Sequence, residues 1–177
     1  NSPTKPKNNS PQKPQAKLSS KDRRADEGKT GKGVLYYKNG NMMYEGMLVE
    51  GRKEGKGKDY YDTGFVKFSG EFKNDLYDGL KCTLYYKLGQ VEYEGGFSEG
   101  ERNGYGKEFS RNGNCIYEGN FLKGERNGKN VTIKYSSGEI QYTGGMINGL
   151  KEGVGKEYNV SGAIFYHGEF KDNMKNG

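Results

Sequence analysis

The side chains that most often build active sites and metal sites are scarce in this sequence. It has no tryptophan, a single histidine and two cysteines. His167 together with Cys82 and Cys115, which lie far apart in the sequence, cannot complete a four-ligand zinc site. No GxxxxGK[ST] motif is present, and the glycine-rich stretches recur too regularly to be phosphate loops. We therefore expect no cofactor, no metal and no catalytic residue, and we interpret both cysteines as free thiols of a reducing compartment.

Apolar residues are also few. They make up 31% of the chain, below the roughly 45–50% of ordinary globular domains. No apolar run approaches the length of about 18 residues that a membrane-spanning helix needs, and no secretory signal is visible. These absences exclude a thick hydrophobic core and a spanning helix, and they favour an elongated protein whose core is thin.

Proline is confined to one end of the sequence. The only prolines are Pro3, Pro6, Pro11 and Pro14, and the first aromatic ring is Tyr36. Residues 1–30 carry eight lysines and arginines against three acidic residues, whereas the remainder is nearly neutral. Such a segment cannot bury enough apolar surface to offset its ordering entropy, so we expect residues 1–30 to be an extended or disordered tail. We expect its basic side chains to dock on a partner: Lys5, Lys7, Lys13, Lys17, Lys21, Arg23 and Arg24.

From residue 31 onward the chain consists of repeats of about 24–25 residues each. In each repeat an aromatic residue is followed two positions later by glycine, and two positions further on by a large apolar residue. The aromatic residues are Tyr44, Phe68, Tyr93, Tyr117, Tyr142 and Tyr166. The glycines are Gly46, Gly70, Gly95, Gly119, Gly144 and Gly168. The apolar residues are Leu48, Phe72, Phe97, Phe121, Met146 and Phe170. Residues 31–177 therefore form one repeat array, separate from the tail, with about five full units and a partial unit at each end.

This spacing predicts β-strands whose rings share one face of a sheet. Alternate residues of a strand point to the same side, so Tyr93, Gly95 and Phe97 lie on one face. The glycine leaves a gap between two rings, and an aromatic ring from the neighbouring strand is expected to cover it. The rings expected to do so are Tyr36, Tyr60, Phe109 and Tyr158.

The segments between the strands predict antiparallel hairpins. Asn-Gly and Ser-Gly pairs at 38–41, 111–114 and 160–163 favour tight turns, and we interpret 50–57 and 99–106 as longer loops. No apolar period of 3.6 is present, so the expected fold class is all-β: an elongated, single-layer antiparallel meander of stacked β-hairpins with an extended N-terminal tail. The second and fourth units are one residue longer than the others, which predicts a superperiod of two units with a bulge in alternate strands.

The stretches YEGNFLKGERNGKN, YEGGFSEGERNGYG and YTGGMINGLKEGVG resemble the MORN repeat family. The resemblance covers residues 31–177 and implies a single-layered sheet of hairpins, often paired into dimers. It also implies a scaffold of ciliary and other cytoskeletal assemblies, a membrane tether, or an accessory domain beside phosphoinositide kinases and a lysine methyltransferase. The family brings no catalytic residues and no cofactor.

Three interpretations of the function remain open. In the first, a non-catalytic scaffold binds other proteins of a large assembly through its ring-bearing face and strand edges. Its tail docks on an acidic surface such as tubulin, and the resemblance suggests a cytoplasmic, cytoskeletal location in a cilium or axoneme. In the second, the basic tail binds anionic membrane or phosphoinositides, although the near-neutral array weighs against this. A third interpretation makes the array the regulatory repeat domain of a larger enzyme, and none of the three involves nucleic acid.

Overall fold

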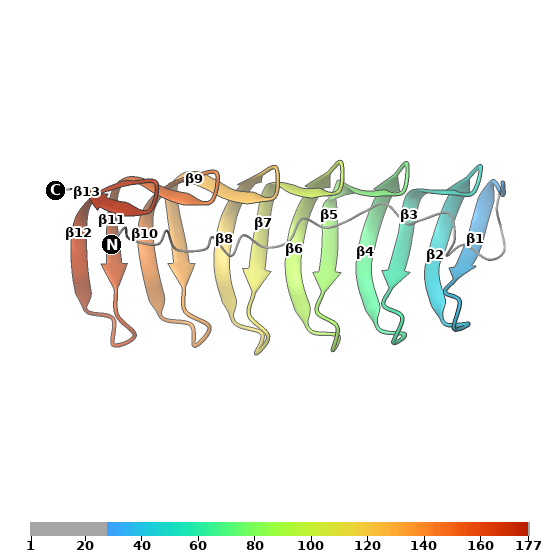
Figure 1. Ribbon diagram of the computed structural model, residues 1–177, viewed down its shortest axis with the longest axis horizontal. Helices are drawn as coiled ribbons and strands as arrows, with labels where there is room; N and C mark the ends of the chain where they lie inside the picture. The colour runs from blue at the N-terminus through green and yellow to red at the C-terminus, as the bar shows by residue number, and fades with distance from the viewer. Residues whose placement is uncertain (1–27, 177) are drawn as a thin grey trace, which may run out of the picture.

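The computed structural model describes residues 28–176, which form one open antiparallel sheet with its strands in sequence order (Figure 1). The strands of this part of the chain are β1 Gly31–Tyr36, β2 Met42–Val49, β3 Arg52–Tyr60, β4 Val66–Lys73, β5 Leu76–Tyr85, β6 Val91–Ser98, β7 Glu101–Phe109, β8 Cys115–Leu122, β9 Glu125–Lys134, β10 Ile140–Ile147, β11 Leu150–Tyr158, β12 Ile164–Lys171 and β13 Met174–Asn176. Each strand pairs with the strands before and after it in the chain, and residues 28–176 contain no helix. The predicted all-β meander is confirmed.

Two kinds of connection alternate along the sheet. A two-residue turn joins β2 to β3, and its residues Glu50 and Gly51 both have positive φ, 50° and 75°. This is the backbone of a type I′ turn, which matches the twist of the flanking strands. Asp75 and Asn173 replace glycine in two of these turns at φ 69° and 68°, because aspartate and asparagine tolerate left-handed backbone.

The other connections have five residues, so the expected assignment of short and long connections was wrong. Residues 52–57 are not loop but the first part of β3. The Asn-Gly segment 38–41 lies in a five-residue loop, in which the Gly40 N–H donates to the Tyr37 carbonyl at 3.0 Å. In this five-residue loop the glycine of the Asn-Gly pair, Gly40, has positive φ, as it also would in a type I′ turn. The dipeptide therefore does not distinguish a five-residue loop from a two-residue turn.

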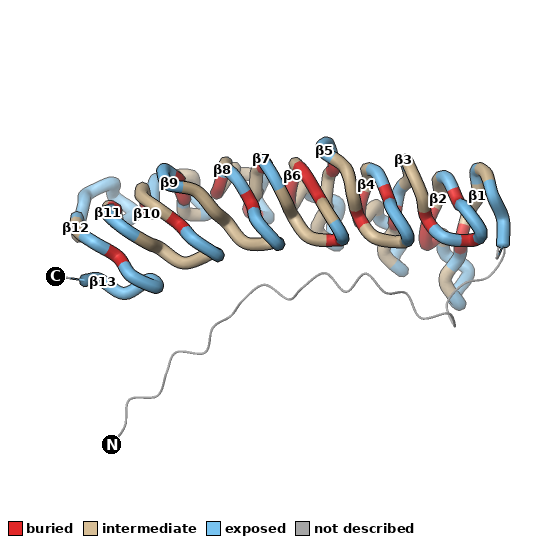
Figure 2. Tube along the Cα trace, turned by 90° about the horizontal axis from the view of Figure 1, so that it is seen from above, coloured by how far each residue is buried: buried red, intermediate tan, exposed pale blue. Residues whose placement is uncertain are grey.

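The strands are bent, and the bend allows a single layer to bury side chains. Four residues of a flat strand span about 13 Å. Yet the ring centroids of Phe68 and Phe72 are 5.2 Å apart, and those of Tyr93 and Phe97 are 5.3 Å apart. Strand pairing shifts register within these segments, for example between Ser69 and Glu71, and such bulges bend a strand. Figure 2 shows from above that the bent hairpins are stacked in a row, with buried segments recurring in most of the strands.

The sheet therefore has an inner face, inside the bend, and an outer face. The inner face carries one continuous core, whose buried members are Leu35, Met43, Tyr44, Leu48, Phe68, Phe72, Tyr77, Cys82, Tyr93, Phe97, Tyr117, Phe121, Val131, Ile133, Tyr142, Met146 and Phe170. The two longer repeat units appear as ten-residue strands, β5 and β9, whereas β3, β7 and β11 have nine residues. Pairing of β5 with β6 skips residues between Gly79 and Cys82, which confirms the bulge expected in an alternate strand.

Candidate functional site

All the rings predicted for the aromatic face lie on the inner face. They are buried, except for the half-buried Tyr166. Edge-to-face contacts link rings of the same strand and rings two strands apart, such as Tyr44 with Phe72 at 5.1 Å and Tyr93 with Phe121 at 5.1 Å. This geometry suits the quadrupoles of two aromatic rings. Sequence reasoning thus found these residues, and the structure assigns them to packing rather than to a binding surface.

The rings that cover the repeat glycines are not the ones expected. A Cβ added to Gly57 would lie 2.5 Å from Cε2 of Tyr44, and one added to Gly106 would lie 2.6 Å from Cε2 of Tyr93. Tyr44 and Tyr93 thus stand two residues before a glycine of their own strand and reach over the paired glycine of the next strand. Tyr117 and Tyr166 cover Gly119 and Gly168, the repeat glycines of their own strands. Tyr36, which was expected in this place, follows the buried Leu35 and therefore points to the outer face. The same alternation places Tyr60, Phe109 and Tyr158 on the outer face.

The hydroxyl explains why tyrosine is favoured over phenylalanine at this position. The Tyr44 hydroxyl donates to the Met47 carbonyl at 2.7 Å, and the Tyr142 hydroxyl donates to the Gly145 carbonyl at 2.8 Å. The bond reaches three residues along the same bent strand, across the glycine. Burial is also the first cause that raises the pKa of Tyr142 to about 12. Ring and glycine therefore act as one unit that holds the bend.

Charged side chains form a ladder within the inner face, which the sequence alone did not lead us to expect. Lys53 forms an ion pair with Asp59, and the two side chains are 1% and 11% exposed. The Lys53 ammonium also lies 5.1 Å from the Tyr44 ring centroid, and the Tyr77 hydroxyl donates to Asp59 at 3.1 Å. Burial lowers the pKa of Lys53, and Asp59 opposes that shift. These groups are buried because they are paired and hydrogen-bonded.

The ladder repeats in every second unit. Glu108 accepts from Arg102 and, at 2.5 Å, from Arg126, and Glu157 occupies the same place two units later. Glu157 pairs with Lys151 and, at 3.0 Å, with Lys175. One acid thus binds groups from two consecutive units. The sequence does contain a pattern that could have indicated this ladder, because Asp59, Glu108 and Glu157 each follow a basic residue by six positions.

The outer face carries a row of polar and charged side chains that are paired strand to strand. We call it the outer charged row, and it consists of Glu45, Lys58, Ser69, Thr83, Glu94, Lys107, Glu118, Thr132, Thr143, Lys156 and His167. Lys58 pairs with Glu45 at 3.5 Å, and Lys107 pairs with Glu118 at 3.1 Å. The side chains of these pairs are 41% to 49% exposed, so each pair contributes only about 0–1 kcal/mol to stability.

Beside this row runs an apolar stripe. Directly paired residues share a face, so each outward ring of an odd-numbered strand stands beside a residue of the next strand. We call the set the outer stripe, and it consists of Tyr36, Met42, Tyr60, Val66, Tyr85, Val91, Phe109, Cys115, Lys134, Ile140, Tyr158 and Ile164. None of these residues is buried, and Tyr36 is 38% exposed. The Tyr60 hydroxyl donates to Glu45 at 2.6 Å, which ties the stripe to the outer charged row. This half-exposed apolar stripe, interrupted by Lys134, is the feature of the sheet best suited to binding another molecule.

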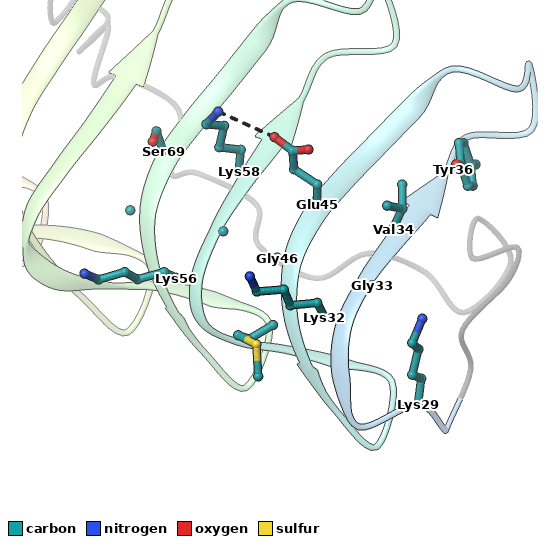
Figure 3. A pocket seen from close by; sticks show the side chains of 13 residues that line it. Lys29, Lys32, Gly33, Val34, Tyr36, Glu45, Gly46, Lys56, Lys58 and Ser69 are labelled. Carbon is teal, nitrogen blue, oxygen red and sulfur yellow. Dashed lines mark ion pairs between the residues drawn. The ribbon is translucent and has the colours of Figure 1, made fainter.

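An open hollow of about 870 Å³ lies on the outer face of β1–β4 (Figure 3). Its floor includes glycine backbone at Gly33 and Gly46, and four lysines surround it: Lys29, Lys32, Lys56 and Lys58. Smaller hollows recur at the equivalent glycines two and four units later. Of these three hollows, the first is lined by the most lysines.

The remaining predicted residues are quickly placed. His167 is an exposed member of the outer charged row. Cys82 is buried, Cys115 belongs to the outer stripe, and both are free thiols. Among residues 28–176, no cluster of three metal-ligating side chains is present and no helix is long and apolar enough to cross a membrane. The expected docking residues Lys5, Lys7, Lys13, Lys17, Lys21, Arg23 and Arg24 lie outside the described residues.

Comparison with known families agrees with this architecture. The model of the MORN repeat matches residues 27–42, 44–64, 68–80, 93–115, 117–129, 142–164 and 166–177. These segments cover more than half of the chain and coincide with the hairpin repeats. No catalytic domain is identified. A search among curated proteins found no match.

Proposed function

Because the chain belongs to the MORN repeat family, we propose that it is a non-catalytic scaffold that binds other proteins through the outer face of its sheet. The observation that supports this is the outer stripe, which spans the array and is covered by no second layer among the described residues. Protein interfaces are enriched in such aromatic side chains with polar groups beside them. The inner face is less suitable because its rings are already buried.

The finer assignment rests on the tail and on the family. We propose that the assembly is cytoskeletal, in a cilium or axoneme, and that the basic tail docks on an acidic surface such as tubulin. Localisation of a tagged chain in cells tests this assignment. If the tagged chain does not concentrate in cilia, this location is excluded, but the scaffold function is not. Dimerisation through the sheet is compatible with the same role.

Variants that remove rings of the outer stripe but keep the fold test the scaffold function. Tyr60→Ser with Phe109→Ser removes two outward rings, and Leu88→Ser with Val160→Ser removes two exposed apolar side chains from five-residue loops as a matched control. Full-length baits of all three forms are crosslinked in native material and the captured proteins identified. We expect the loop variant to retain partners that the stripe variant loses. Identical capture by all three baits contradicts the proposal.

Membrane tethering is the second candidate, supported by the lysines around the first hollow. Each lysine near an anionic surface contributes about 1 kcal/mol of attraction. Sedimentation of the full-length chain with vesicles containing phosphatidylserine tests it. No co-sedimentation at moderate salt removes this candidate.

A further inference from the structure

A groove crosses the outer face of β1–β4 where four glycines stand directly opposite one another. We call it the glycine groove: Gly33 pairs with Gly46, Gly46 with Gly57, and Gly57 with Gly70. Side chains at these positions would point to the inner face, where a Cβ added to Gly57 meets the ring of Tyr44. The outer side is therefore bare backbone, and it forms the floor of the hollow of about 870 Å³ (Figure 3).

The bend of the strands opens this groove. A strand that closes around the inner face spreads its outward side chains apart on either side of the glycine. The four paired glycines span three strand spacings, which is about 14 Å. An extended polypeptide covers that length with about four residues, and bare glycine allows another backbone to approach closely. The groove therefore has the shape for an extended segment that lies along the array.

The walls of the glycine groove are basic. Lys32 and Lys56 stand on one side of the glycines and Lys58 stands on the other, as Figure 3 shows. Lys29 lies at the end beside β1. Among the described residues that line the hollow, these four lysines face a single carboxylate, that of Glu45. An acidic ligand is therefore complementary to the groove in charge.

Two of the lysines can pair with a ligand without breaking an existing contact. Lys58 already pairs with Glu45 at 3.5 Å. Lys32 and Lys56 are exposed and form no ion pair within residues 28–176. Glu71 stands opposite Lys56 in β4 but does not line the hollow. The groove thus presents two cations on one wall that a carboxylate can reach.

The equivalent hollows further along the array lack this excess of positive charge. Among the described residues, the charged side chains that line the hollow two units later are Lys81, Lys107 and Glu94. In the hollow four units later Lys156 is the one lysine, with His167 beside it. Lysines exceed carboxylates by three in the first hollow and by one in each of the others. Charge therefore selects the first hollow for an acidic ligand.

We propose that the glycine groove binds an acidic, extended segment of a partner protein, whose carboxylates pair with Lys32 and Lys56. An apolar side chain of the same segment contacts Val34 and Met47, which line the groove beside these lysines. A compact anion such as phosphate fills only part of a groove of this length, so an extended chain is the better match. The inference rests on the proposed function, because it names the chemistry of a partner for one part of the same outer face.

Titration of the full-length chain with a labelled peptide tests this. The probe is a fluorescein-labelled, glutamate-rich peptide with a central leucine, and its control has glutamine in place of every glutamate. We expect fluorescence anisotropy to show saturable binding of the glutamate peptide alone, weakening as salt is added. We expect the same peptide to shift the amide signals of the glycine groove and to leave those of Gly95 and Gly144 unchanged.

Two double variants separate the groove from the overall positive charge. Lys32→Gln with Lys56→Gln alters the glycine groove, and Lys81→Gln with Lys156→Gln alters the two equivalent hollows. Both variants lower the net charge equally, and none of the four lysines forms an ion pair within residues 28–176, so thermal unfolding should be the same in both. We expect the first variant to bind the peptide at least about fivefold more weakly and the second less than about twofold.

Equal weakening by the two double variants overturns the proposal, because it assigns binding to the overall charge. Shifts confined to other parts of the array overturn it as well. Inorganic phosphate and phosphatidylserine vesicles are tested with the same variants. If either depends on Lys32 and Lys56 while the peptide does not, the groove is a site for compact anions or lipid and the proposal fails. If the peptide does not bind in the groove while partner capture still depends on the outer stripe, the proposed function survives and this inference fails.

Discussion

Gly106→Ala is the sharpest test of the contact between ring and glycine. The new Cβ would lie 2.5 Å from Cζ and 2.6 Å from Cε2 of Tyr93, whereas ordinary contacts begin near 3.4 Å. Tyr93 is fully buried, its hydroxyl donates to the Gly96 carbonyl at 3.0 Å, and the Arg102 guanidinium lies 4.8 Å from its ring centroid. The ring must therefore shift by about 1 Å, against packing on both sides.

The expected cost combines two effects. Overpacking of this kind costs about 1–3 kcal/mol, and weakening the hydroxyl bond adds about 1 kcal/mol. A loss of about 2–4 kcal/mol lowers the Tm by about 4–16 °C in a chain of this size. Thermal unfolding followed by circular dichroism measures it. Gly113→Ala is the matched control, since open space surrounds that glycine and only its φ of 86° resists alanine, at about 1 kcal/mol.

A double-mutant cycle separates the clash from any intrinsic preference for glycine in a strand. In a Tyr93→Leu background the ring is gone, so Gly106→Ala should cost at least about 1 kcal/mol less than in the wild-type chain. Equal cost in both backgrounds, or an unchanged Tm for Gly106→Ala alone, refutes the argument that the ring requires a bare backbone.

Two further predictions concern the inner ladder. Lys53→Met should destabilise by about 3–5 kcal/mol in thermal unfolding because it leaves Asp59 buried without its cation, and adding Asp59→Asn should recover part of the loss; an additive double variant would contradict the pairing. For Glu157, partial burial favours a higher pKa, but hydrogen bonds from Lys151 and Lys175 outweigh it and hold the pKa below the ordinary 4.5. The unfolded state therefore binds the proton more readily, so the stabilisation is present above about pH 4.5 and disappears as the pH falls through the lower folded value. Urea titrations from pH 6 to pH 3 should show a smaller loss of stability for Glu157→Gln than for wild type, and parallel losses would count against it.

The sequence predicted the sheet because its period is carried by residues with strong geometric requirements. A ring, a glycine and a second apolar residue at fixed spacing are compatible with few folds. The ring that covers each glycine was harder to predict from the sequence. A flat strand keeps Tyr93 away from its own Gly95, so a neighbouring ring was expected to cover the glycine, and only the bend brings the ring of the same strand across it.

The inner ladder escaped prediction for a different reason. Charged residues usually remain hydrated, and nothing in the composition distinguishes Lys53 from Lys58, which stands exposed on the outer face. The pairing depends on alternation relative to the bend, since Asp59 and Lys53 lie on the ring-bearing side. The sequence analysis named four rings of the outer stripe, Tyr36, Tyr60, Phe109 and Tyr158, but it assigned them to the wrong face of the sheet.

The carboxylates at 59, 108 and 157 give this array a natural counting unit. Each binds groups contributed by two consecutive hairpins, so cutting or duplicating the chain after a single hairpin removes one of these partners from a carboxylate inside the bend. Shortened or extended versions of the chain should remain stably folded when whole pairs of hairpins are removed or added. Repeats are therefore expected to be gained or lost two at a time.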